Sequence, residues 1–220
     1  MPSLMPRGLR RHERATLGYS AAGEMGRGMF EGLAGDFAML VAVSHFMVSS
    51  RWLLWVLSAA PFMGYVASLL AGPLAGSRRK KSVIRVLEGS ACILLMAAAC
   101  VTTGAKYIFL MAAGLGLARF ATPLISGLYG SNFRTRVRGP AVSRLQMLRL
   151  GTVAATGAAA GMLMERDTAL YRPYLLTLCL VMLGCAWFAW KLPEAYPSSR
   201  PCSRAALKHG LRDCIAIMTK

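Results

Sequence analysis

Long apolar stretches alternate along the chain with short polar or basic ones. Each apolar run is close in length to the roughly 20 helical residues that cross a bilayer. The pattern predicts an all-α membrane protein with six transmembrane helices. The expected spans are residues 30–49, 52–76, 86–104, 107–129, 145–164 and 173–190.

The sharpest change of character lies at Gly72–Lys81. Residues 52–75 carry no charge, and a run of four cations follows, made of Arg78, Arg79, Lys80 and Lys81. Such a junction is typical of an apolar helix that leaves the membrane and enters a tight basic turn. The positive-inside rule predicts that this turn is cytoplasmic.

Most basic residues fall on one side of the predicted bundle. Of the 26 Lys and Arg residues, 21 lie on the side of both termini, 4 on the other side, and Arg119 inside the fourth span. This asymmetry predicts cytoplasmic termini. The chain then divides into a basic cytoplasmic arm (1–29), a transmembrane bundle (30–191) and a basic cytoplasmic tail (192–220). We expect a multi-pass protein of a plasma membrane, such as a bacterial inner membrane.

The composition favours a membrane environment over a soluble one. Of the 220 residues, 55% are hydrophobic and only 16% are charged, against about 25% charged in ordinary soluble domains. The net charge is +17, but the cations lie between apolar runs and not on one helix face. This placement fits topology signals and anionic lipid, so the lipid bilayer is the expected partner and nucleic acid is not.

The six cysteines do not indicate a metal site or a disulfide framework. They form no C-x-x-C pair and have no histidine at a ligand spacing. Cys202 and Cys214 lie in the expected cytoplasmic tail, where thiols stay reduced. The other four fall in apolar runs, where a thiol acts as a small hydrophobe: Cys92, Cys100, Cys179 and Cys185. We expect no disulfide, no metal and no cofactor.

Several segments resemble the major facilitator superfamily. Gly72 and Lys80–Lys81 match the first glycine and the cationic end of that family's loop between the second and third helices. Gly76 stands where the family has aspartate, Ser77 where it has a cation, and Arg79 where it has glycine. The resemblance also rests on Arg138-Gly139-x-Ala141 before the fifth span, on residues 57–76, and on Pro193-Glu194, so that it covers residues 30–195.

The resemblance implies a specific architecture and activity. Facilitators have two six-helix halves, each built from two inverted three-helix repeats, and they move solutes by alternating access. This chain resembles the N-terminal half, and its tail resembles the connector to a seventh helix. Gly72, Arg78–Lys81, Arg138 and Gly139 would then form part of a gating loop. Without a carboxylate at Gly76, one partner of the family's usual charge network is absent.

Three residues within the expected first and fourth spans are candidates for binding a small solute. Arg119 lies near the middle of the fourth span, where an arginine is costly and faces protein or water. By the resemblance it would bind an anionic or polar solute, and the alternative is a structural pair with Asp36 or with another span. Asp36 is a candidate for proton or cation coupling, or for an interfacial pair. His45 either titrates near neutral pH or lies at the interface as a hydrogen-bonding residue.

Three further charged residues are expected near membrane surfaces. Glu31 is expected at the interface. Glu88 is expected to pair with the basic loop or to favour its helix N-terminus. Arg149, in the first turns of the fifth span, is expected to extend to the cytoplasmic surface.

The titratable residues form no catalytic pattern, so we expect no enzyme. A rhomboid-type protease needs a histidine on a later helix, but after His45 the next is His209. The leading hypothesis is a half-length facilitator-like transporter, completed by a homodimer or a separate subunit. The alternative is a truncated or regulatory membrane interaction protein that does not transport.

Overall fold

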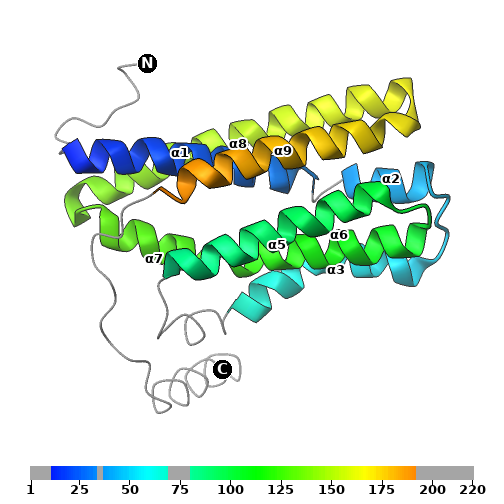
Figure 1. The fold of residues 1–220 in the computed structure, drawn as a ribbon, viewed down its shortest axis with the longest axis horizontal. Helices are drawn as coiled ribbons and strands as arrows, with labels where there is room; N and C mark the ends of the chain where they lie inside the picture. Colours follow the sequence, from blue (N-terminus) through cyan, green and yellow to red (C-terminus); the bar gives the residue numbers. More distant parts are fainter. Residues whose placement is uncertain (1–10, 34–36, 69–79, 192–220) are drawn as a thin grey trace, which may run out of the picture.

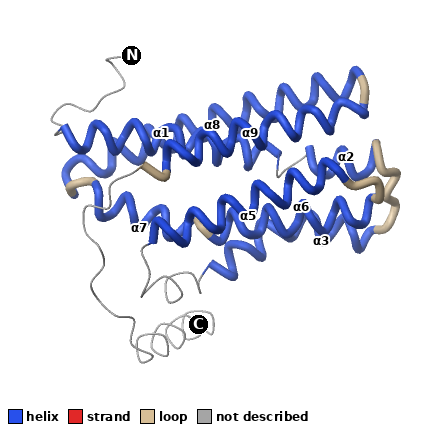
Figure 2. The backbone as a smooth tube through the Cα atoms, in the orientation of Figure 1, coloured by secondary structure: helices blue, strands red, loops and turns tan. Residues whose placement is uncertain are grey.

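The computed structural model describes residues 11–33, 37–68 and 80–191, and these residues are almost entirely helical (Figure 2). No strand occurs within the described ranges. The α-helices are α1 (Arg11–Gly32), α2 (Ala38–Ser44), α3 (Arg51–Ala67), α5 (Lys80–Cys100), α6 (Gly104–Phe120), α7 (Thr122–Asn132), α8 (Thr135–Arg166) and α9 (Tyr171–Ala189). A short 3₁₀ helix, η4 (Thr168–Leu170), precedes α9.

The helices pack as two groups that meet along one seam (Figure 1). In one group α1 packs against both α8 and α9. In the other, α6 packs against both α3 and α5. Contact between α5 and α9 joins the groups, and the apolar core that results includes Leu33, Leu95 and Leu175, all fully buried.

Four helical stretches are long and apolar enough to cross a membrane: Lys81–Cys100, Gly104–Gly130, Thr135–Arg166 and Thr168–Phe188. The outer surface is also apolar, and large side chains such as Phe62 (68% exposed) and Leu180 (65%) project outward. Extended apolar exteriors are unusual on soluble monomers. These features are those of a membrane protein.

The two other expected spans, 30–49 and 52–76, include undescribed residues. Residues 34–36 separate α1 from α2, and residues 69–79 follow α3. The described part of α3 has 17 residues, carries no charged side chain after Arg51, and exposes Trp52 and Trp55, which stack on each other. Such aromatic pairs suit a membrane–water interface.

Two helix starts differ from the sequence-based expectations. The first helix begins at Arg11 and not near Phe30, so much of the expected arm belongs to the helical bundle. α8 begins at Thr135, ten residues before the expected start at Leu145, and includes Pro140. The segment expected as a basic loop before the fifth span is therefore mostly helical.

Glycines allow two pairs of helices to approach closely. A Cβ on Gly64 of α3 would lie 2.4 Å from the carbonyl oxygen of Gly116 on α6. A Cβ on Gly28 of α1 would lie 2.6 Å from the carbonyl oxygen of Arg149 on α8. Small residues that let backbones meet are a common basis of helix packing in membranes, and both contacts adjoin the polar centre described next.

Candidate functional site

Helix α1 turns a polar stripe toward the inside of the bundle. The stripe consists of Glu13, Thr16, Ser20, Glu24, Arg27 and Glu31. Steps of three and four residues put all six on one helix face. The four at its beginning are at most 2% exposed. A helix of a soluble protein turns its apolar face to the core and its polar face to solvent. In α1 the polar face points inward, and it brings charged side chains to the centre of the bundle.

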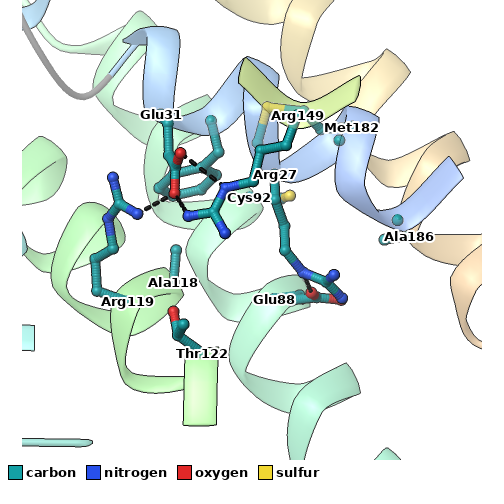
Figure 3. Close-up of a pocket in the computed structure, with 13 residues that line it drawn as sticks. Arg27, Glu31, Glu88, Cys92, Ala118, Arg119, Thr122, Arg149, Met182 and Ala186 are labelled. Atoms are coloured by element: carbon teal, nitrogen blue, oxygen red, sulfur yellow. Dashed lines mark hydrogen bonds and ion pairs between the residues drawn. The ribbon is translucent and has the colours of Figure 1, made fainter. Parts of the chain in front are cut away.

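Glu31 lies between two arginines from different helices (Figure 3). Its carboxylate accepts hydrogen bonds from Arg119 Nη1 of α6 and from Arg149 Nη2 of α8. Arg149 Nε donates a further hydrogen bond to Glu31 Oε2 at 2.8 Å. Arg119 Nη1 also donates to the hydroxyl of Tyr65 on α3, at 2.7 Å, and its guanidinium lies 5.1 Å from the centre of the Tyr65 ring. One carboxylate thus ties three helices together.

Two further carboxylates, those of Glu24 and Glu88, contact Arg27 of α1. Arg27 Nη1 lies 2.7 Å from Glu24 Oε1, and Arg27 Nε lies 3.0 Å from Glu88 Oε1 on α5. The hydroxyl of Tyr129 on α7 donates to Glu24 Oε1 at 2.5 Å and accepts from Arg27 Nη1 at 3.1 Å. These contacts connect α1 to α5 and α7.

The two groups form one structure, which we call the central charge network: Glu24, Arg27, Glu31, Glu88, Arg119 and Arg149. Arg149 Nη1 lies 3.8 Å from Glu24 Oε2 and joins the two groups. The network holds three arginines and three glutamates, so its formal charge is zero. Buried charges are tolerated when they are paired and hydrogen-bonded, and charged residues inside membrane helices usually face the bundle and serve a function.

Two cavities adjoin this network. One, of about 50 Å³, is lined by Glu31, Arg119, Arg149, Thr122, Cys92 and Met182, among others. The other, of about 240 Å³, is lined by Glu24, Arg27 and Arg149 of the network. It also contacts Thr122 and extends to Arg138 and Gln146. A site needs roughly 10–15 Å³ for each water. In this conformation the smaller cavity has room for a few waters beside the ion pairs.

Of the candidate solute-binding residues, the structure brings only Arg119 into the network. Among the described residues Arg119 pairs with Glu31, and Asp36, the partner expected from the sequence, lies outside the described residues. His45 directly follows α2. The centre of its ring lies 4.6 Å from that of the Tyr171 ring and 4.9 Å from that of the Phe46 ring. His45 is thus not among the residues that line the two cavities.

The gating-loop candidates lie partly outside the described residues. Gly72, Arg78 and Arg79 fall there, while Lys80 and Lys81 begin α5. Arg138 donates to the carbonyl oxygen of Gly130 at 2.6 Å and to that of Phe133 at 3.4 Å. Carbonyls at a helix end lack partners within the helix, so Arg138 stabilises the end of α7. Gly139 lies within α8 and has open space around it.

Three charged residues that were expected near membrane surfaces have partners within the bundle. Glu31 and Arg149 bind each other, and their side chains are only 14% and 12% exposed. Glu88 pairs with Arg27 of α1, and most of the basic loop with which it was expected to pair lies outside the described residues. The count from the sequence places Arg27 and Arg149 among the cytoplasmic cations, and without them the Lys and Arg split becomes 19 to 4. The charge asymmetry therefore persists.

The arrangement can bind charge. Among the described residues no group of three His, Cys, Asp or Glu side chains is placed to hold a metal ion. Arginine guanidinium groups and carboxylates provide matched donors and acceptors for a polar or ionic group. No protein-family model matches this chain, and no curated protein matches it. Its function therefore has to be inferred from this geometry.

Proposed function

We propose that the chain is one half of a transporter of the major facilitator type, which moves a small solute by alternating access. The central charge network carries this proposal. It joins α1, α5, α6 and α8 around a cavity, in a chain with helices able to cross a membrane. Ionisable residues at such depth mark solute and ion pathways. Arg119, Glu31 and Arg149 are the proposed solute-binding residues.

The packing pattern supports two inverted three-helix repeats. Let α1–α2, α3 and α5 form the first repeat, and α6–α7, α8 and α9 the second. Exchanging the repeats turns the α1–α8 contact into the α6–α3 contact, and the α1–α9 contact into the α6–α5 contact. The α5–α9 contact is unchanged by the exchange. All five contacts occur, as a two-fold relation between the repeats requires, and in facilitators that relation is an inversion.

Six spans follow in this proposal when the two interrupted helices are included. The first span is α1 with α2, and the second begins with α3. With six spans and the 19-to-4 asymmetry, both termini are cytoplasmic. The small-residue face of α8 supports a further partner, because Gly151, Ala154 and Ala158 are exposed and only 17% of the most apolar part of α8 is buried.

A second six-helix half is needed for alternating access. It would come from the rest of a longer chain, a separate subunit or a second copy. The other candidate function is a membrane interaction protein that does not transport. The same exposed face of α8 favours it, since such a face suits any helical partner.

Cysteine crosslinking in vesicles tests whether a second copy forms the missing half. We expect Ala158→Cys, in a background without native cysteines, to form a disulfide-linked dimer when this chain is the sole membrane protein. Leu180→Cys is the matched control, because Leu180 is also accessible, at 65% exposure, but lies on α9 and not on α8, and this variant should remain monomeric. A strictly monomeric Ala158→Cys protein would contradict transport by this chain alone.

A further inference from the structure

Resting on the proposed transport function, we propose that the solute carries a carboxylate, which binds between Arg119 and Arg149 in place of Glu31. Glu31 takes up one proton from water when it is displaced. One proton therefore binds with each negative charge, and the total charge of the network and its bound solute stays zero.

The geometry identifies the ligand because a carboxylate already occupies the position. Glu31 accepts hydrogen bonds from both arginines, through three of their nitrogens. Two guanidinium groups that converge on one carboxylate fit its planar, two-oxygen shape. Glu31 is thus an internal ligand of a carboxylate-binding site, and the adjoining cavity of about 50 Å³ offers room for the rest of a small solute.

The surrounding groups explain why the proton goes to Glu31. On α1 the neighbouring charged residues are Glu24 and Arg27, and α5 contributes Glu88 and the thiol of Cys92. Among the described residues, Tyr65 of α3 and Tyr129 of α7 complete the set, and α9 presents Met182 and Ala186 to the cavity. Glu24 and Glu88 both keep Arg27 as a partner. Glu31, by contrast, makes its ion pairs with the two arginines that the solute would take over.

Electroneutrality sets the stoichiometry. The network is neutral with three arginines and three glutamates. A bound carboxylate adds one negative charge, and Glu31, left without its arginines, would be an unpaired charge in an apolar site. Such a carboxylate favours its protonated form. One proton on Glu31 restores neutrality, so solute and proton bind together.

Acetate binding to the full-length protein in nanodiscs tests this proposal. Titration calorimetry in two buffers of different ionisation enthalpy counts the protons bound. We expect about one proton to bind per acetate. In the pH range where Glu31 is ionised in the free protein, the acetate affinity should therefore fall about tenfold for each unit by which the pH rises. Glu31→Gln, which resembles the protonated form, should bind acetate without proton uptake. Glu13→Gln is the control, because Glu13 is a buried carboxylate of the same helix that pairs with Arg134, and it should keep the proton uptake.

Several results would overturn the proposal. Acetate binding without proton uptake in the wild type would do so, and this measurement needs no variant. So would an absence of acetate binding in folded protein, equal binding of chloride, or tighter binding of inorganic phosphate. The assay requires neither flux nor a second half, so it can fail while the crosslinking test succeeds, and the reverse also holds.

Discussion

Replacing Glu31 with leucine is expected to lower the free energy of unfolding by about 3–5 kcal/mol, the typical cost of removing one partner of a buried ion pair. The substitution leaves Arg119 and Arg149 near each other without the carboxylate that both contact. Two like charges in a site of low polarity repel each other and lack solvation. Denaturant or thermal unfolding in detergent measures the loss.

A combined variant separates charge from packing. Glu31→Leu with Arg119→Met and Arg149→Met should recover most of the lost stability, because an apolar cluster of similar size often replaces buried ions without loss. It should no longer bind acetate. Glu165→Leu is the matched control at an exposed position of α8, where a change within about 0.5 kcal/mol is expected. A Glu31→Leu protein as stable as the control would contradict a structural network at this site.

Gly64→Ala is the second substitution for which we expect a large effect. A Cβ at this position would lie 2.4 Å from the carbonyl oxygen of Gly116 and 2.9 Å from Cβ of Arg119. The obstacle is backbone, which a rotamer change cannot relieve, so α3 and α6 must separate. Overpacking of this kind costs about 1–3 kcal/mol. Thermal unfolding should show the loss, and acetate binding should weaken because Arg119 moves with α6.

Gly184→Ala provides the comparison for Gly64→Ala. Gly184 lies in α9, and a Cβ added there would meet nothing within 4 Å. Alanine favours a helix by about 0.8–1.0 kcal/mol over glycine. We expect this variant to be slightly more stable than the wild type. Equal behaviour of the two variants would show that the α3–α6 approach is not tight.

The apolar helices were predictable because their signal is local. The runs at residues 86–104, 107–129 and 173–190 overlap α5, α6–α7 and α9, since a span needs about 20 apolar residues whatever its partners. The all-helical class followed from the same runs. Arg119 stood out for the same reason, as a charge within an apolar run.

Helix α1 was missed because charged residues mark the boundaries of apolar runs. Glu24, Arg27 and Glu31 lie before the first apolar run or at its edge. The signal was nevertheless present, since the polar residues from Glu13 to Glu31 recur at steps of three and four. That period identifies one face of a helix. It does not by itself tell whether the face points to solvent or to the interior.

The pairing within the network could not be read from the sequence. Arg119 and Glu31 are 88 positions apart, and Arg149 and Glu31 are 118 apart. The contact between Arg149 and Glu31 depends on the close approach of α1 to α8 at Gly28. The early start of α8 was missed because Gly139-Pro140 suggests a loop. Proline is tolerated in membrane helices where neighbouring groups satisfy the backbone.

Transport of the proposed kind requires that the polar centre faces an aqueous path while the apolar exterior faces lipid. Labelling with a membrane-impermeant methanethiosulfonate reagent in sealed vesicles tests it, with single cysteines in a background without native ones. We predict that Thr122→Cys, beside the network, reacts, and that Phe109→Cys does not, although Phe109 is 55% exposed on the protein. Both should react after denaturation. Rapid labelling of Phe109→Cys together with a protected Thr122→Cys would contradict the account.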